Sequence, residues 1–221
     1  MRIIAATKIM KANEELAGKN RARFRRDGVY TVNMMGSPGC GKTTLLEALF
    51  RALAGRATTA VIEGDLASSI DAERIEKQGV AVVQINTEGA CHLDASMVAA
   101  ACDAIDLKKA DLLVIENVGN LVCTAGFDLG EQLRIVLLST SEGDDKVAKY
   151  PTIFQKSDAL VITKADLLTH SNFSVDRATT DTKRLNPRAE VFQLSAMTGE
   201  GVESLVEWLL EKRDSAGKPT K

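Results

Sequence analysis

The sequence predicts an α/β fold with a mostly parallel, seven-stranded sheet and helices on both of its faces. Short β-branched apolar runs alternate along the chain with stretches of helical periodicity, which is the order that βαβ units produce. Most of these runs are nearly continuous in apolar residues, as expected of strands covered on both faces. A glycine-rich segment also separates the first such run from the helix that follows it.

The alternation predicts each element in turn. Apolar runs predict strands at Val29–Met35, Thr59–Glu63, Ala81–Ile85, Leu112–Glu116, Arg134–Ser139, Ala159–Thr163 and Glu190–Leu194. Helical spacing predicts helices at Lys42–Leu53, Ser69–Lys77, Ala95–Ile105, Ser174–Leu185 and Gly201–Lys212. With 221 residues and 45% hydrophobic content, the chain can bury one substantial core, so we expect a single domain over residues 1–221.

Two terminal segments lie outside the alternation. Residues 1–26 are predicted to form an appended helix, beginning near Ile3, whose basic residues crowd its C-terminal end. These cations are typical of a solvated helix stabilised through its dipole, and the alternative is a docking helix for a partner protein. Residues 214–221 are polar and contain Gly217 and Pro219, so they are expected to fray.

The charge balance excludes several classes of function. The chain carries 28 basic and 30 acidic residues, a net charge of −2, which gives no overall attraction to nucleic acid or to a membrane surface. No apolar stretch is long enough to span a bilayer, and the first ten residues lack a leader pattern. We therefore expect a cytoplasmic protein. Its four cysteines are expected to be thiols, metal ligands or core residues rather than disulfides.

The segment Gly36–Thr43 matches the phosphate-binding pattern G-x-x-x-x-G-K-[ST] at every fixed position and predicts the P-loop NTPase fold. Glycines let backbone N–H groups turn inward around phosphates, and the following helix directs its positive dipole end at them. Lys42 is expected to reach the β- and γ-phosphates, and Thr43 to ligate Mg²⁺. The residues expected to contact the nucleotide here are Gly36, Ser37, Gly39, Cys40, Gly41, Lys42, Thr43 and Thr44.

Cys40 is an unusual residue within this loop. It is either a simple packing residue or a redox-sensitive thiol made more acidic by the neighbouring Lys42. Cys102, on a predicted helix, is expected to be a core residue.

Guanine selectivity is predicted by the tetrapeptide Thr163-Lys164-Ala165-Asp166, which resembles the N/T-K-x-D element of GTPases. The Asp166 carboxylate can accept from both N1–H and the exocyclic amine of guanine, a donor pair that adenine lacks on that edge. Lys164 is expected to lie along the base, and Thr163 stands where asparagine is usual. Ser195 and Ala196 resemble the S-A-x loop that supports the base through backbone N–H groups. We expect GTP and GDP as ligands.

Carboxylates at two further strand ends are candidates for holding Mg²⁺. Asp65 and Glu116 each follow an apolar run and reach the same sheet edge as the phosphate loop. Gly119 is expected to donate its N–H to the γ-phosphate. Loss of this phosphate is then expected to release Gly119 and Asp65 together. Lys42, Asp65 and Glu116 are the expected catalytic residues, and slow hydrolysis is expected because no glutamine is placed to orient water.

Cys91, His92 and Cys123 form a second candidate site. They lie in two loops that open at the carboxyl edge, and thiolate and imidazole are ligands that zinc and nickel favour. A fourth ligand must come from water or from another chain. The alternative is a buried thiol beside a polar histidine. Because Cys123 is four residues past Gly119, movement of the γ-phosphate loop is expected to couple GTP state to metal affinity.

Several longer runs resemble the HypB family of GTPases, which helps deliver nickel to [NiFe] hydrogenase. They are Glu63–Asp65, Val83–Thr87, Gly89–Ala95, Ile115–Cys123 and Glu142–Lys146, and the resemblance extends from Val29 to Leu210. It implies a homodimer favoured by GTP, with Cys91, His92 and Cys123 of both subunits forming a zinc or nickel site. It also implies a HypA-type metallochaperone and the hydrogenase large-subunit precursor as partners.

The resemblance leaves specific departures and alternatives. The related UreG proteins carry a Cys-Pro-His motif that this chain lacks, and no N-terminal cysteine motif or histidine-rich stretch is present. The loop Lys146–Lys149 either reaches across the dimer toward nucleotide or is a solvated charged turn. The alternative functions are a UreG-like nickel GTPase, a metal carrier in which GTP only stabilises the dimer, and, less favoured, a small-molecule kinase, since no arginine-rich lid is evident.

Overall fold

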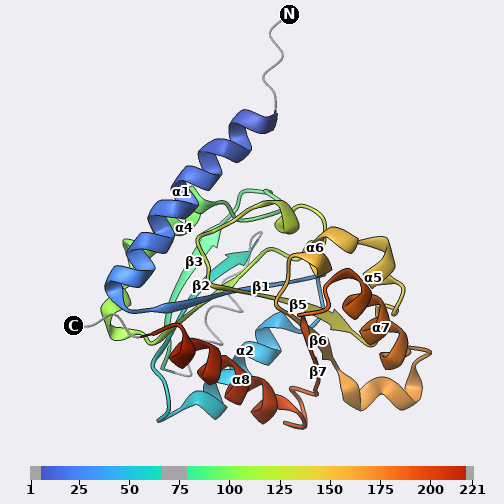
Figure 1. Cartoon of the computed structure of the whole chain (residues 1–221). Coiled ribbons are helices and arrows are strands. Elements are labelled where there is room, and N and C mark those ends of the chain that lie inside the picture. Colours follow the sequence, from blue (N-terminus) through green and yellow to red (C-terminus); the bar gives the residue numbers. More distant parts are fainter. Residues whose placement is uncertain (1–5, 66–78, 218–221) are drawn as a thin grey trace, which may run out of the picture.

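The computed structural model describes residues 6–65 and 79–217, and seven strands of this part form one sheet (Figure 1). The strand order is β3-β2-β4-β1-β5-β6-β7, and every neighbouring pair is parallel. The strands are β1 Tyr30–Gly36, β2 Thr59–Asp65, β3 Ala81–Asn86, β4 Leu112–Glu116, β5 Leu133–Ser139, β6 Ala159–Thr163 and β7 Glu190–Gln193. The predicted α/β fold and seven-stranded parallel sheet are confirmed.

Helices connect these strands. The α-helices are α1 Ala6–Asp27, α2 Lys42–Leu53, α4 Ala95–Cys102, α5 Lys146–Lys149, α6 Pro151–Gln155, α7 Val175–Leu185 and α8 Val202–Ser215. Short 3₁₀ turns are η1 Leu107–Lys109, η2 Thr124–Gly126 and η3 Ala165–His170. The helix predicted at Ser69–Lys77 lies outside the described residues.

Two boundaries differ from the prediction for a local reason. The helix predicted to reach Ile105 ends at Cys102, because the N–H groups of Asp103 and Ala104 bond to carbonyls three residues back and tighten the last turn. At the C-terminus, α8 continues to Ser215, so the prediction that residues 214–221 fray was wrong for the first of them. The Ala216 N–H still bonds to the Lys212 carbonyl there.

Helices cover both faces of the sheet, because alternate residues of a strand point to opposite sides. From β4, Leu112 and Val114 pack in the cluster that contains the apolar face of α2 and α8, whereas Leu113 and Ile115 pack with Phe24 of α1 and with α4. All of these side chains are buried. A third cluster joins β5 and β6 to α6 and α7. The sheet is therefore a rigid, covered platform, and its carboxyl edge is where loops can form a site.

The N-terminal helix α1 is docked on the domain itself. Phe24 is fully buried, and Asn20 donates to the carbonyls of Ala95 (2.8 Å) and Leu129 (3.0 Å). Arg21 donates from one nitrogen to both carboxylate oxygens of Asp128, at 2.7 and 2.8 Å. The prediction of a merely solvated helix was therefore wrong for its inner face.

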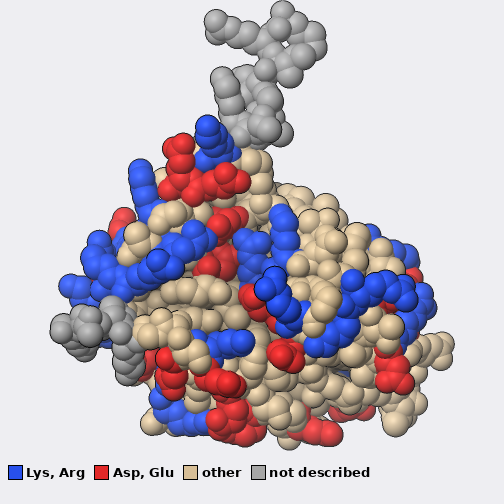
Figure 2. All heavy atoms as spheres, viewed as in Figure 1, with Lys and Arg blue, Asp and Glu red and all other residues tan. Residues whose placement is uncertain are grey.

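The outer face of α1 matches the expected charge pattern. In Figure 2, basic side chains gather over the C-terminal end of α1, with acidic side chains beside them. None of the described helices combines the length and the apolar character that crossing a membrane requires.

Candidate nucleotide and metal site

The loop between β1 and α2 has the backbone that phosphate binding requires. Gly39 and Gly41 have φ of 73° and 95°, in the left-handed region that favours glycine. Gly41 is also the N-cap of α2, and no side chain caps the first N–H groups of this helix. These donors and the positive end of the helix dipole therefore remain available to an anion.

A cavity of about 450 Å³ opens beside this loop. It is lined by Pro38, Gly39, Gly41, Lys42, Thr43, Thr44, Glu63, Gly64, Glu116, Asn117, Val118, Gly119 and Lys164. Lys42 is 9% exposed, and its Nζ lies 3.4 Å from the Ser37 carbonyl, across the loop. The buried ammonium is held at the cavity wall, where it can pair with a phosphate.

The magnesium candidates converge only in part. The Thr43 hydroxyl donates to Oε1 of Glu116 at 3.1 Å, so both predicted groups lie together in the cavity. Hydroxyl and carboxylate oxygens are the donors that Mg²⁺ prefers, and these two residues therefore fit that ion. Asp65 ends β2 at the same edge, but its side chain lies outside the described part.

The sequence interpretation missed Glu63. This residue is 2% exposed, lines the cavity and stands beside Glu116 in the parallel register of β2 and β4. The signal was present, since Glu63 precedes Asp65 by two residues and so lies on the same face of β2. Two adjacent buried carboxyl groups bring oxygen ligands of the kind that a divalent cation prefers to this end of the cavity.

Gly119 brings the loop after β4 against the phosphate loop. A Cβ added at Gly119 would lie 2.9 Å from the N, Cα and Cγ atoms of Pro38. Asn120 continues the contact, because its N–H donates to the Gly36 carbonyl at 2.9 Å. The two loops therefore form one continuous cavity wall, and only glycine allows their close approach.

The predicted base-reading segment follows β6 and contacts the phosphate loop from the other side. Lys164 has φ of 57°, and its Nζ donates to the Gly39 carbonyl at 2.8 Å. The Thr163 hydroxyl donates to the Cys40 carbonyl at 2.6 Å. Thr163 therefore braces the phosphate loop, which accounts for threonine at this position without a contact to a base.

Asp166 and the Ser195 loop lie at the same end of the sheet. Asp166 is exposed, with its carboxylate available to a ligand. The Ala165 N–H donates to the Leu194 carbonyl at 3.0 Å, which joins the two predicted base loops. Ser195 is buried and its hydroxyl accepts from the Thr198 N–H at 3.2 Å, so it shapes the loop that carries the half-buried Ala196.

Cys40 behaves as a packing residue in this structure. Its side chain is fully buried, and burial raises the pKa of the thiol to about 11, although Lys42 acts in the opposite direction. A Cβ at Gly36 would lie 2.5 Å from Cys40 Sγ, so the thiol occupies the space that Gly36 leaves open. The thiol is therefore protonated at neutral pH, which favours packing over redox sensitivity.

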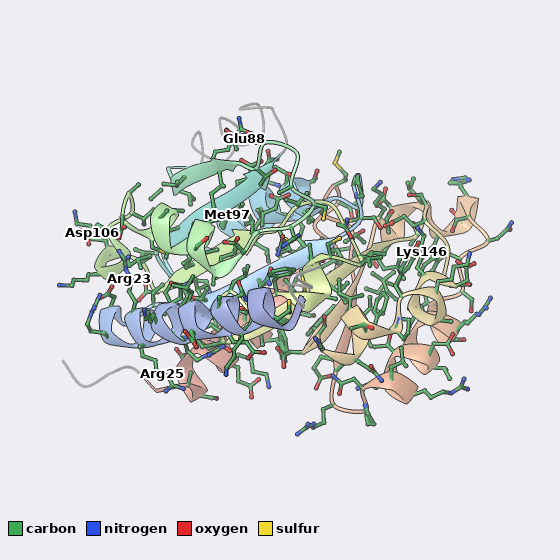
Figure 3. All side chains as sticks on the ribbon, turned by 90° about the horizontal axis from the view of Figure 1, so that it is seen from above. Arg23, Arg25, Glu88, Met97, Asp106 and Lys146 are labelled. Carbon is green, nitrogen blue, oxygen red and sulfur yellow. The ribbon has the colours of Figure 1, made fainter. Side chains whose placement is uncertain are left out.

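The residues Cys91, His92 and Cys123 come together as the sequence predicted. Their ligand atoms all lie within 4.8 Å of one another, and Cys91 Sγ is 3.4 Å from His92 Nδ1. Cys91 and His92 lie in the connection from β3 to α4. In the sequence they fall between Glu88 and Met97, two residues that Figure 3 labels. Cys123 lies in the loop after β4. The cluster reaches solvent, with Cys91 exposed and Cys123 partly so.

The donor chemistry of this cluster fits a borderline-soft cation. Burial lowers the pKa of His92, whose ring stacks on Phe127 with centroids 3.8 Å apart, so the imidazole is neutral and can ligate. Contact with the Cys91 thiol raises the pKa of Cys123, so a metal ion must displace a proton there. Ligands on one tetrahedral zinc lie about 3.7 Å apart, and a small contraction of the cluster reaches that spacing.

The predicted loop Lys146–Lys149 is a short helix, α5. Lys149 pairs with Asp145 at 2.6 Å, and the ammonium of Lys146 stands 5.5 Å from the centre of the Tyr150 ring. Figure 3 labels Lys146, and its contact across a dimer stays a prediction.

The fold, the phosphate loop and the adjacent cavity define a P-loop nucleotide-binding protein that also carries a thiol–imidazole cluster. The model of the CobW/HypB/UreG nucleotide-binding domain matches residues 30–193. This chain belongs to that family and, within it, to the HypB hydrogenase maturation factors.

Curated relatives resemble nearly the whole chain. Hydrogenase maturation factor HypB from Rhizobium leguminosarum bv. viciae is 46% identical over 209 residues, which cover 94% of this chain and 70% of that protein. The probable hydrogenase maturation factor HypB from Methanocaldococcus jannaschii is also 46% identical, over 92% of each chain.

A solved structure of HypB from Helicobacter pylori in complex with nickel has a TM-score of 0.89 and 43% identity, covering 95% of this chain and 99% of that one. HypB from Archaeoglobus fulgidus has a TM-score of 0.86 at 38% identity, covering 92% and 99%.

Proposed function

We propose that this protein is a GTP-hydrolysing metallochaperone that aids nickel insertion into [NiFe] hydrogenase during its maturation. The observation that carries the proposal is the position of Cys91, His92 and Cys123. Their ligand atoms lie within 4.8 Å of one another, on loops that follow β3 and β4. Because β4 also delivers Glu116 to the nucleotide cavity, nucleotide and metal would bind to the two ends of one loop.

The nucleotide would be GTP with Mg²⁺, held by residues already described. Lys42 and the N-terminus of α2 would bind the phosphates, and Asp166 would read guanine. Thr43, Glu116 and Asp65 would hold Mg²⁺ directly or through water, and the bound ion would neutralise charge that develops on the phosphate oxygens. The buried Glu63 would strengthen the same site. The products would be GDP and phosphate.

The metal would be cargo rather than a resident cofactor. Two thiols and one imidazole leave a tetrahedral ion one ligand short, which supports transfer to and from other proteins. In the homodimer that we propose GTP to favour, the cluster of the second copy would complete the site. A HypA-type metallochaperone and the hydrogenase large-subunit precursor would be the partners, in the cytoplasm, and zinc or nickel would occupy the ligands.

A second candidate function is nickel delivery to urease. A relative from Helicobacter pylori, 45% identical over 93% of this chain, is named a hydrogenase/urease maturation factor. The adjacent Cys91 and His92, without the intervening proline of UreG proteins, argue against a UreG-like nickel GTPase.

The first experiment measures nickel and zinc affinity together with oligomeric mass, in GDP and in a non-hydrolysable GTP analogue, alongside GTP turnover. We expect turnover, and metal affinity and dimer formation that depend on the nucleotide. Lys42→Ala should abolish turnover while the nucleotide-free protein keeps its metal affinity, because Lys42 lies on the phosphate loop and not in the cluster. A protein that binds GTP without hydrolysing it would instead be a metal carrier stabilised by nucleotide.

A further inference from the structure

Two asparagine side chains join the nucleotide cavity to the metal cluster. From this geometry we infer that Asn117 and Asn120 are positioning residues that transmit the nucleotide state to the metal ligands, one to each half of the cluster. Asn117 holds the segment that carries Cys91 and His92, and Asn120 holds Cys123. The inference rests on the proposed function, because it concerns how the two sites communicate.

Asn117 is fully buried directly after β4 and uses both ends of its amide. Its Oδ1 accepts from the Val118 N–H at 3.0 Å and from the Leu93 N–H at 3.1 Å. Its Nδ2 donates to Oδ1 of Asn33 in β1 at 3.3 Å, which fixes the orientation of the amide. One oxygen atom therefore binds the backbone of the cavity wall and the backbone that follows the ligand His92.

Leu93 is held at a second point as well. Its side chain is fully buried and lies over Gly64 in β2, where an added Cβ would approach the Leu93 side chain to 2.8 Å. Gly64 also lines the nucleotide cavity and precedes the predicted magnesium ligand Asp65. The residue next to His92 thus contacts both strand ends that are expected to respond to the nucleotide.

Asn120 performs the matching task for Cys123. Its backbone N–H donates to the Gly36 carbonyl at the start of the phosphate loop, at 2.9 Å. Its side-chain Oδ1 accepts from the N–H groups of Val122 (2.7 Å) and Cys123 (2.9 Å). The thiol of Cys123 is therefore positioned by a residue that is itself paired with the phosphate loop.

These bonds make the two sites move together. Val118 and Gly119 lie between the two asparagines and line the cavity where the γ-phosphate is expected. A shift of this short segment displaces the side-chain oxygen of Asn117 on one side and Asn120 on the other, because breaking their hydrogen bonds would leave polar groups unpaired at a cost in free energy. The distance between His92 and Cys123 then changes with the nucleotide. Metal affinity follows, since it depends on the spacing of the ligands.

The test compares Asn117→Ala with a matched control, Asn13→Ala. Asn13 on α1 accepts from the Ala95 N–H at 2.9 Å and donates to the Asp128 carbonyl at 2.8 Å. The control therefore removes side-chain hydrogen bonds to the start of α4, two residues after Leu93, and Asn13 does not line the cavity. The measurement is the ratio of nickel affinities in the GTP analogue and in GDP, with nucleotide affinity recorded in parallel.

In the unmodified protein we expect a ratio in the usual range of coupling between sites, about 5- to 150-fold. Asn117→Ala should bring this ratio close to one while the protein still binds both ligands, and Asn13→Ala should preserve it. Asn120 is only partly buried, so Asn120→Ala provides a variant that keeps the fold, and it should also lower the ratio. A merely structural asparagine would lower both affinities and leave their ratio unchanged.

The outcomes separate the two proposals. If the unmodified protein shows no nucleotide-dependent nickel affinity, the proposed coupling of GTP to metal fails. If the unmodified protein shows it and both Asn117→Ala and Asn120→Ala keep the full ratio, the transmission through the asparagines is overturned while the proposed function stands.

Discussion

The nucleotide cavity and the Cys91/His92/Cys123 cluster lie on the same sheet edge but are built differently. The cavity is built around the phosphate loop, whose backbone conformation is set by glycines and whose ammonium, on Lys42, is buried, and residues at the ends of β2 and β4 complete its wall. The cluster is assembled from two loops far apart in the sequence, and its thiols reach solvent. Hydrogen bonds to the side chains of Asn117 and Asn120, together with the packing of Leu93 over Gly64, connect its loops to the cavity wall.

The difference teaches how each site can be changed. A cavity built on backbone groups keeps its shape when a single side chain is removed, so substitutions there alter affinity and selectivity. A cluster built on side chains in exposed loops loses its ligand set when one of them is replaced, and its geometry can follow the loops that carry it. The first site is suited to recognition and the second to exchange.

The largest expected effect separates the two sites through base recognition. Asp166→Asn should weaken GTP binding by at least about 100-fold, because the amide cannot accept from two donors of guanine as a carboxylate does. Xanthosine triphosphate, which presents an acceptor in place of the exocyclic amine, should bind the variant better than GTP. Competition with a fluorescent guanine nucleotide measures both affinities. Nickel affinity without nucleotide is the control, and a parallel loss there would contradict the separation of the two sites.

The converse change removes a metal ligand. Cys123→Ala should weaken nickel and zinc binding by at least about 100-fold, since loss of groups that only support ligands already costs 10- to 100-fold. GTP affinity should remain. Cys102→Ala is the matched control, because Cys102 is a buried thiol outside the cluster. Chelator competition measures the metal affinity, and equal affinities in the two variants would show that Cys123 is no ligand.

A change of pH should sharpen the same contrast. Binding of a metal displaces the proton of a thiol, so nickel affinity should rise with pH, by about tenfold per pH unit for each proton released. The raised pKa of Cys123 shifts this dependence toward alkaline pH, whereas the lowered pKa of His92 keeps the imidazole neutral at neutral pH. Titrations between about pH 6.5 and 8.5 measure the slope. Cys123→Ala should reduce it, and an unchanged slope would assign the released proton elsewhere.

The smallest effect concerns α1, which should influence stability and neither site. Arg21→Ala should lower the free energy of unfolding by about 1 kcal/mol, a value discounted for the partial exposure of its pair with Asp128. Burial alone would raise the pKa of the Asp128 carboxyl, but hydrogen bonds from the Gly130 N–H and from Arg21 lower it below its ordinary value. The stabilisation is therefore present above the ordinary carboxyl pKa and is lost as pH falls through the lowered value.

Urea unfolding at neutral and acidic pH measures this contribution. The control is Arg25→Ala, which should have no comparable effect. Arg25 is exposed, lies one turn further along α1 and is labelled in Figure 3. A change of nickel or nucleotide affinity in Arg21→Ala would show that α1 also acts on the sites.

Sequence alone determined the fold class, the phosphate loop and the members of the Cys91/His92/Cys123 cluster. The phosphate loop and the tetrapeptide predicted to read the base are short segments that depend on local spacing, and continuous apolar runs specify buried parallel strands. The carboxyl ends of such strands meet at one edge, which is why Cys91 and Cys123 could be expected to approach each other.

Only the tertiary structure decided which side chains connect these parts. Glu63 stands beside Glu116 because β2 and β4 pair in a particular register, and Thr163 reaches the Cys40 carbonyl because β6 ends next to the phosphate loop. Asn117 meets Leu93 across 24 positions of sequence. Such contacts depend on strand order and on the conformation of loops, and no local sequence pattern encodes either. The sequence does not show which asparagine side chains are buried, nor which groups they bond to.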